Sequence, residues 1–354
     1  MKIAINTGGG DAPGLNAVIR AVVNAAERKG WSVYGIREGY NGFFQPGGIR
    51  PLTTEMVRGI TPLGGTILGT VNRGNPFEYP TEDGRVVDIS EQVVRKFWEQ
   101  GFDALIVVGG DGSFRIAKRF AEMGIPLVAV PKTIDNDVNA THVTFGFQTA
   151  VQTATECLDK LHPHAEAHRR VVCVEVMGRY CGWIALSAGV AATADVILIP
   201  EIPYDIEKVC EKIEARWRAG RRFAICVVAE GAYPKEGQMV VLKEELGREV
   251  RLGGIAAVVA EEIEKRTGRE TRALSLGHLL RGGHPIAYDR VLALEYGTAA
   301  VRAIEEGAFG CMVSYDPPNM VFRPIEDGIR EIKRVPLDGE LIRCAREMGI
   351  CLGD

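Results

Sequence analysis

Short apolar runs alternate with segments of helical periodicity along most of the chain, and this alternation limits the fold more than any other feature. The first example is a strand-like segment, Lys2 to Asn6, which leads through three glycines into an apolar helical face from Leu15 to Ala26. The pattern predicts an α/β fold with a mainly parallel sheet and helices on both of its faces. Further strands are expected at 104–108, 126–130, 170–176, 196–200, 223–228 and 271–274, and helices from residue 114 and at 147–161, 205–217 and 254–266. The final stretch, 307–354, is expected to hold one return strand and a terminal helix.

Composition excludes several classes of protein. The 354 residues suffice for about two domains. A net charge of −4, from 42 Lys and Arg against 46 Asp and Glu, argues against a nucleic-acid or membrane-surface partner. No apolar run approaches the roughly 20 residues of a membrane-spanning helix, and no signal-peptide pattern opens the chain, so a cytoplasmic protein is expected. The eight cysteines include no C-x-x-C pair and are expected to be reduced thiols.

The first glycine-rich loop, Gly8–Gly14, follows the first predicted strand. Leu15 and Asn16 replace the Lys-Ser/Thr pair of a P-loop, and the glycine spacing does not fit G-x-G-x-x-G. Backbone amides at a helix N-terminus can still bind an anion. A tight turn explains the glycines equally well.

The second loop, Gly109–Ser113, places Asp111 among glycines directly before a predicted helix. A carboxylate at a phosphate-binding loop would repel phosphate unless a cation lies between them, so Asp111 is a candidate Mg²⁺ ligand. The alternative is a simple N-cap, a position at which aspartate is common.

The third loop, Pro131–Asn139, carries two carboxylates, Asp135 and Asp137, beside Lys132 and Thr133. Phosphoryl transfer to a hydroxyl requires a carboxylate that accepts the proton and cations that offset charge. Asn and Asp are also frequent in turns, so a structural explanation stays open for this loop alone.

Candidate phosphate-binding cations lie in two later segments. Arg179 lies in Met177–Gly182, and Arg272, His278 and Arg281 lie in 271–283. Arginine binds phosphate through two parallel hydrogen bonds, which suits a phosphorylated substrate. Each of these residues taken singly is better explained as a surface or structural group.

Taken together in order, five motifs resemble the 6-phosphofructokinase family over residues 2 to about 300. They are Gly-Gly-Asp-Ala-Pro-Gly-Leu-Asn, Gly-Gly-Asp-Gly-Ser, Pro-Lys-Thr-Ile-Asp-Asn-Asp, Glu-Val-Met-Gly-Arg and Gly-His-Leu-Leu-Arg-Gly-Gly. The resemblance implies two closely packed three-layer α/β lobes. Residues 1–146 with 280–330 are expected to bind the phosphate donor, and 147–279 with 331–354 the sugar phosphate.

The resemblance also implies the reaction and its residues. ATP, with Mg²⁺, phosphorylates the C1 hydroxyl of fructose 6-phosphate in glycolysis, and Asp135 accepts the hydroxyl proton, assisted by Thr133, Asp137, Arg179 and Gly10. The implied donor residues are Gly10, Arg73, Gly110, Asp111 (also the metal ligand), Gly112, Ser113 and Lys132. The implied sugar-phosphate residues are Thr133, Asp135, Arg170, Met177, Gly178, Arg179, Glu230, Arg272, His278 and Arg281. Because Arg170 and Arg272 reach a neighbouring subunit's site in relatives, a homo-oligomer, a tetramer or a dimer, is expected.

Two positions bear on the donor. In the family, glycine at 112 accompanies ATP and aspartate there accompanies pyrophosphate, whereas a lysine at 132 also accompanies pyrophosphate. An aspartate at 112 would put negative charge near the α-phosphate of ATP, so we weigh Gly112 above Lys132 and expect ATP. Ile116 stands where bacterial ATP enzymes have a glycine near the adenine, so the shape of that pocket is open.

Effector control is expected to differ from the family's bacterial pattern. Arg20 and Arg221 match basic positions of the effector site, but Asn24 and His162 occupy positions where arginine is found. Activation by ADP is therefore expected to be missing.

Three other functions fit the sequence less well. A reversible pyrophosphate-dependent phosphotransferase would tolerate loss of the adenine contacts. A non-catalytic nucleotide-binding subunit has no chemical need for Asp135, Asp137, Asp111 and Arg179 together. A dinucleotide oxidoreductase lacks the glycine fingerprint.

Overall fold

The computed structural model describes residues 1–71, 74–81, 83–243 and 251–354. The chain divides into two compact units. The first contains 1–133, 138–148 and 281–332, and the second contains 134–137, 149–280 and 333–354. The loop Ile134–Asp137 thus groups with the second unit, although the residues on both sides of it belong to the first. No helix among the described residues has the length and apolar character needed to cross a membrane.

The sheet of the first unit is parallel in its middle and antiparallel at both edges. Its order is β3 (Ile49–Leu52), β2 (Ser32–Ile36), β1 (Lys2–Thr7), β6 (Ala104–Gly109), β7 (Leu127–Thr133), β15 (Cys311–Asp316) and β16 (Asn319–Pro324). Off this path, β8 (Phe145–Gly146) pairs with β7, and β4 (Tyr79–Pro80) and β5 (Val86–Val87) form a separate pair. The mainly parallel α/β architecture is confirmed. The loop expected from Pro131 was wrong in one detail, because the strand continues through Thr133.

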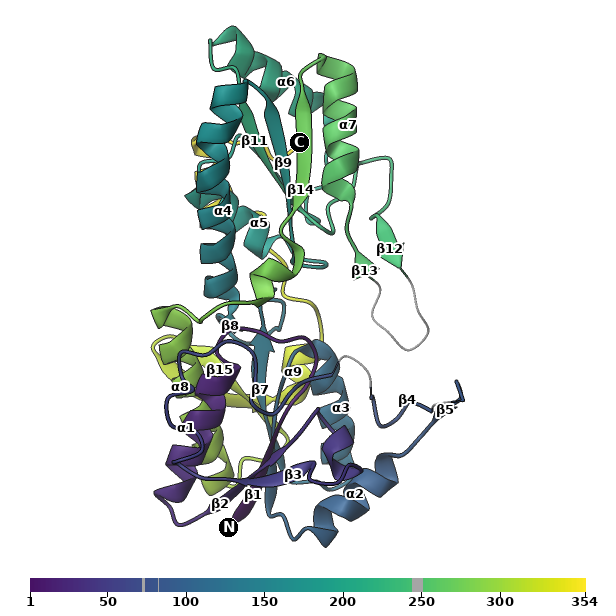
Figure 1. Ribbon diagram of the computed structural model, residues 1–354, viewed down its shortest axis with the longest axis vertical. Helices are drawn as coiled ribbons and strands as arrows, with labels where there is room; N and C mark the ends of the chain where they lie inside the picture. The colour runs from purple at the N-terminus through teal and green to yellow at the C-terminus, as the bar shows by residue number, and fades with distance from the viewer. Residues whose placement is uncertain (72–73, 82, 244–250) are drawn as a thin grey trace. The chain divides into compact units, whose positions relative to one another are not determined.

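Helices cover this sheet on both faces (Figure 1). On one face α1 (Leu15–Glu27) packs against α8 (Ala287–Glu305). On the other face lie α2 (Ser90–Glu99), α3 (Asp111–Glu122) and α9 (Ile325–Ile329). The core between these helices and the sheet contains Phe97 of α2 and Phe114 and Phe120 of α3. These rings pack with alternate, inward-facing residues of β1, β6 and β7.

The strand order creates a topological switch point between β1 and β6. The helix after β1 leads to β2 on one side, whereas the helix after β6 leads to β7 on the other. The loops that leave the carboxyl ends of these two strands therefore diverge, and such a point is where open α/β sheets bind ligands. The glycine loop Gly8–Gly14 and the start of α3 both lie there.

The second unit has a four-stranded, wholly parallel sheet. Its order is β10 (Val196–Leu198), β11 (Ala224–Ala229), β9 (Val171–Val176) and β14 (Thr271–Ser275). Helices α6 (Ile206–Arg218) and α7 (Ile255–Thr267) share a buried core with one face. The remaining elements are α4 (Phe147–His168), α5 (Trp183–Ala191), α10 (Glu340–Glu347) and the antiparallel pair of β12 (Val241–Lys243) and β13 (Arg251–Leu252). Two short 3-10 turns, η1 (Asn41–Phe43) in the first unit and η2 (Gly277–Arg281), also occur.

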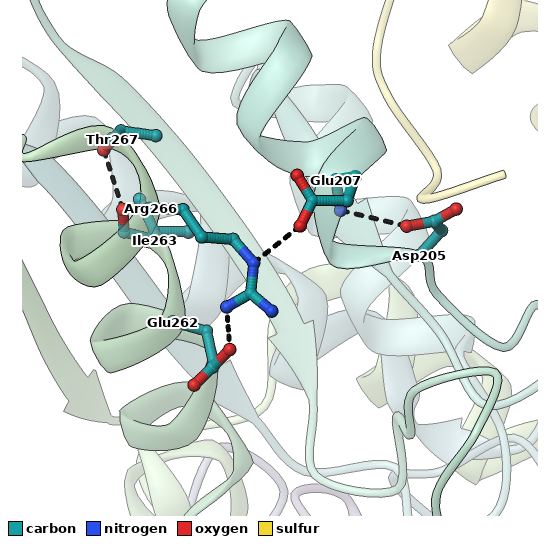
Figure 2. Close-up of polar contacts among 6 residues, drawn as sticks. All are labelled: Asp205, Glu207, Glu262, Ile263, Arg266 and Thr267. Atoms are coloured by element: carbon teal, nitrogen blue, oxygen red, sulfur yellow. Dashed lines mark hydrogen bonds and ion pairs between the residues drawn. The ribbon is translucent and has the colours of Figure 1, made fainter.

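An ion-pair network joins α6 to α7 (Figure 2). Asp205 caps α6 by accepting a hydrogen bond from the backbone N–H of Glu207 at 2.9 Å. Arg266 of α7 donates to the Glu207 carboxylate at 2.7 Å and also pairs with Glu262 of its own helix. Exposed pairs of this kind contribute little individually, so buried apolar residues dominate this helix pair.

Several other element boundaries differ from the sequence prediction. The helix expected from Phe114 begins at Asp111, and α4 continues to His168 through Pro163. The single return strand expected after residue 307 is a hairpin, β15 and β16, followed by α9 and α10. All eight cysteines are free thiols, and five of them are buried.

Candidate functional site

Glycines allow the loop after β1 to approach the start of α3 closely. The Gly8 N–H donates to the Val108 carbonyl at 2.9 Å, which ties the loop to the end of β6. A Cβ at Gly8 would lie 2.8 Å from Ser113 Oγ, and one at Gly109 would lie 2.3 Å from Ser113 Cβ. Larger residues at either position would therefore separate the loop from the helix N-terminus that can bind an anion.

Asp111 is the first residue of α3 and does not act as its cap. The N-cap is Gly110, with no side-chain capping bond, so the simple N-cap explanation of Asp111 was wrong. Arg115 holds the Asp111 carboxylate instead, with its Nε and Nη2 each 3.1 Å from a different carboxylate oxygen. The carboxylate remains one-third exposed, at 34%.

Asp111 fits a Mg²⁺ ion of the kind that is held by one carboxylate and by substrate phosphates. No cluster of three or more metal-ligating side chains occurs among the residues that the structure describes. The donor oxygens and water would therefore complete the coordination of an ion at Asp111. Gly112 is exposed in the same first turn, and Ile116 is half-buried against the core of the first unit.

Two cations hold the glycine loop. Lys132, on β7, is buried with 3% of its surface exposed, and its Nζ donates to the Gly10 carbonyl. Arg281 donates from Nη1 to the Asp11 carbonyl at 3.3 Å, and a Cβ at Gly10 would lie 2.9 Å from that nitrogen. The structure thus places Arg281 beside the loop of the first unit. Its assignment to the sugar phosphate stays a prediction.

The second unit carries the expected base. Asp135 is buried with 3% exposed, and it lies in the loop Ile134–Asp137 at the end of β7. Between the two aspartates, Asn136 has a positive φ of 52°, a conformation that non-glycine residues adopt at some cost in energy. Lys333, from the C-terminal segment, donates from its backbone N–H to the Asp137 carbonyl at 3.0 Å. Its Nζ donates to Asn136 Oδ1 at 3.1 Å.

Glu230 shapes the loop after β9. Its Oε1 accepts hydrogen bonds from the backbone N–H of Arg179 at 2.9 Å and from that of Gly178 at 3.3 Å. A Cβ at Gly178 would lie 2.5 Å from the Cys181 carbonyl, and the φ of 144° there also favours glycine. Glu230 therefore fixes the backbone from which the Arg179 side chain extends. Met177, at the start of this loop, is half-buried.

Lys333 links the two loops of the second unit, because its backbone N–H donates to the Asp137 carbonyl at 3.0 Å and its own carbonyl accepts from Cys181 Sγ at 3.4 Å. Burial raises the pKa of the Cys181 thiol, and the charges of Asp137, Glu201 and Asp135 raise it further. Cys181 lies in the loop after β9, so the two aspartates of the loop after β7 act on it through space. The structure thus brings Asp135 and Asp137 to the loop that carries Arg179.

The remaining predicted residues belong to other segments of the chain. Arg170 and Arg272 both bind Glu270, with N–O distances of 3.0 and 2.6 Å. His278 is exposed in η2. Arg73 lies outside the described residues.

Sequence reasoning missed three groups that hold predicted residues: Arg115 on Asp111, Glu270 on the two arginines, and Lys333 on Asn136. For Arg115 the signal was available, because a residue four positions after an aspartate lies on the same helical face. Lys333 had none, because it lies far along the chain from its partner.

One unit has a helix N-terminus and cations at its switch point, and the other has a buried aspartate in a loop that is joined to an arginine-bearing loop. These features define a phosphoryl-transferring α/β protein. A phosphofructokinase family model matches residues 2–304. The chain belongs to the phosphofructokinase family, as the five motifs indicated.

The names of this chain's relatives include two different phosphate donors, ATP and pyrophosphate. It is 47% identical over 353 residues to an ATP-dependent 6-phosphofructokinase of Chloroflexus aurantiacus, which covers 100% of this chain and 98% of the relative. It is 48% identical over 343 residues to a pyrophosphate–fructose 6-phosphate 1-phosphotransferase of Amycolatopsis mediterranei, covering 96% and 97%. Overall identity therefore does not separate the donors.

Solved structures agree on the fold. The structure of Pichia pastoris phosphofructokinase in the T-state matches with a TM-score of 0.81 and 32% identity, over 93% of this chain and 35% of that longer chain. A pyrophosphate-dependent phosphofructokinase from Marinobacter aquaeolei matches with a TM-score of 0.79 at 20% identity, over 100% of this chain and 93% of that one.

Proposed function

We propose that this protein transfers a phosphoryl group from ATP to the C1 hydroxyl of fructose 6-phosphate and so forms fructose 1,6-bisphosphate. The observation that carries the proposal is a buried Asp135 in a loop that Lys333 joins, through hydrogen bonds, to the loop that presents Arg179. Full-length similarity to 6-phosphofructokinases supports the substrate. Gly112, exposed at the start of α3, supports ATP because it adds no charge or bulk beside a nucleotide.

In this mechanism Asp135 accepts the proton of the attacking hydroxyl, and Arg179 stabilises charge on the transferring group. The backbone amides of Gly10 and Asp11, in the loop that Lys132 and Arg281 hold, orient the donor phosphates. A Mg²⁺ ion on Asp111 would offset charge on the donor oxygens.

The other predicted residues have accessory parts in the proposal. On the sugar side, Thr133 and Asp137 support the base, and Met177, Gly178, Glu230, His278 and Arg281 contribute to sugar-phosphate binding. On the donor side, Gly110 and Ser113 provide backbone and hydroxyl groups at the helix N-terminus. Arg73, outside the described residues, is proposed for the same side.

We also propose a homo-oligomer in which Arg170 and Arg272 complete a neighbouring subunit's site. Both arginines bind Glu270 in the single chain, so they are already grouped at one end of β9 and β14. Two guanidinium groups around one carboxylate can also receive a phosphate.

The donor is tested by initial rates with fructose 6-phosphate and Mg²⁺, with ATP or pyrophosphate supplied in parallel. We expect turnover with ATP. Protein carrying Asp135→Ser and purified identically serves as the control, because its rate reports any contaminating kinase. Turnover with pyrophosphate alone would show that Lys132, rather than Gly112, decides the donor.

We expect no activation by ADP. A surface pocket of about 510 Å³ is lined by Arg20, Asn24, Glu27, Arg28, Thr54, Glu55 and Arg58. It contains two carboxylates and an asparagine, and Arg20 donates to Thr61 at 2.9 Å, so its cations are partly neutralised or engaged. Fructose 6-phosphate saturation curves should be hyperbolic and unchanged in shape by ADP. A sigmoidal curve that ADP makes hyperbolic would contradict this expectation.

A further inference from the structure

Lys333 contacts the base-carrying loop through both its backbone and its side chain. Its N–H donates to the Asp137 carbonyl at 3.0 Å, and its ammonium donates to Asn136 Oδ1 at 3.1 Å. These bonds hold Asn136, which lies between the two aspartates and has a positive φ of 52°. An asparagine in this conformation persists when its surroundings compensate its cost.

The carbonyl of the same lysine holds the second loop of the site. It accepts a hydrogen bond from Trp183 Nε1 at 2.8 Å and one from Cys181 Sγ at 3.4 Å. Its ammonium also lies 5.4 Å from the centre of the Trp183 ring. One residue of the C-terminal segment therefore joins the loop after β7 to the loop after β9, and both loops belong to the second unit.

Lys333 is half-buried, and even partial burial of an ammonium group costs free energy, which points to a role other than stability. Burial lowers the pKa of Lys333 to about 8 from its ordinary 10.5, while the charge of Asp137 acts in the opposite direction. The titratable and charged groups around this cluster are Asp135, Asp137, Cys181, Glu201 and Arg334. Because the folded protein binds this proton less tightly than the unfolded chain, Lys333 opposes folding below about pH 8, and the opposition fades as the pH rises toward 10.5.

We propose that Lys333 is a positioning residue for phosphoryl transfer, which holds Asn136 so that Asp135 and Asp137 keep the orientation that proton transfer requires. The inference rests on the proposed function of Asp135. Lys333 need not touch the substrate in this role. It acts through Asn136, and its cation balances the carboxylates on either side of that residue.

The test compares turnover and KM for fructose 6-phosphate in Lys333→Met and Asn136→Gly. Methionine keeps most of the length of the side chain without its charge, and glycine accepts the positive φ without the amide. We expect turnover to fall roughly 10- to 100-fold in each variant, as misplaced catalytic groups do, with KM close to the wild-type value. The double variant should lose little more than either single one, because both changes break the same contact.

Two further variants separate positioning from general disruption. Arg334→Met removes the neighbouring cation, which is exposed and donates to the Tyr180 carbonyl at 3.4 Å, and it should keep wild-type turnover. Lys333→Arg keeps its charge above pH 8, so it should retain turnover at alkaline pH where the wild-type rate declines. The thermal midpoint of Lys333→Met at pH 7 should equal or exceed that of the wild type, because the cost of burying the ammonium is removed.

Wild-type turnover in Lys333→Met would overturn the inference. It would also be overturned if the fold-loss of turnover in the double variant equalled the product of the fold-losses in the two single variants. A lowered thermal midpoint in Lys333→Met that accounts for its lost turnover would overturn it too. Turnover of the Asp135→Ser variant distinguishes failure of the proposed function from failure of the proposed role of Lys333. If that variant keeps its turnover, the role of Asp135 is wrong, whereas a large loss there with none in Lys333→Met rejects the role of Lys333 alone.

Discussion

Replacing Asp135 by serine is expected to lower turnover by about 10²-fold or more, because the attacking hydroxyl loses the carboxylate that accepts its proton. Asp135 is buried with 3% exposed, so water has little access to replace the base. Fructose 6-phosphate binding should largely survive, since proton transfer occurs in the transition state and contributes little to ground-state binding. Steady-state rates at saturating substrate measure the first effect, and calorimetric titration with the sugar phosphate measures the second.

The matched control for this prediction is Asp338→Ser, which removes an exposed aspartate of the same unit. It should leave turnover at the wild-type value. Near-normal turnover in Asp135→Ser would reject Asp135 as the base. Loss of sugar-phosphate binding together with turnover would show instead that the aspartate organises the binding site.

Replacing Gly112 by aspartate is expected to lower kcat/KM for ATP by about 10²-fold or more. Two unit charges 4 Å apart repel by about 4 kcal/mol at the effective dielectric constant of a protein surface, enough for such a loss. Gly112 is exposed in the first turn of α3, where glycine has a poor helix propensity, so the fold should tolerate the change. Initial rates at varied ATP and fixed fructose 6-phosphate measure the effect.

Gly112→Asn is the control that separates charge from volume, because asparagine has the shape of aspartate without its charge. If charge decides, the asparagine variant should retain most of the ATP activity that the aspartate variant loses. Equal losses in both variants would assign the effect to steric exclusion. Unchanged ATP use in Gly112→Asp would remove position 112 from the choice of donor.

The family resemblance assigns two arginines to a neighbouring subunit's site, but it does not identify the residue that binds them within this chain. The resemblance to the family gave Arg170 and Arg272, and in the structure they share Glu270. Nothing in the motif marks that carboxylate. Any phosphate that binds these arginines must compete with it, which is a property of their three-dimensional arrangement.

The sequence by itself determined the α/β class, the strands that carry the site and the loops at their carboxyl ends. This was possible because apolar periodicity and glycine-rich turns are local, and every parallel strand delivers its following loop to the same edge of the sheet. The motifs also placed Asp111, Asp135 and Arg179 on those loops. Boundaries were less accurate at β7 and α3, where polar residues continue a strand or begin a helix.

Only the tertiary structure decided how those loops are held. It assigned Ile134–Asp137 to the second unit, placed Lys132 and Arg281 on the glycine loop, and joined Lys333 to Asn136. Lys333 and Asn136 are 197 positions apart in the sequence, and no local pattern carries information over that distance. The sequence specifies the chemical groups of each residue. Tertiary packing determines which partner orients a residue, because packing brings distant segments of the chain together.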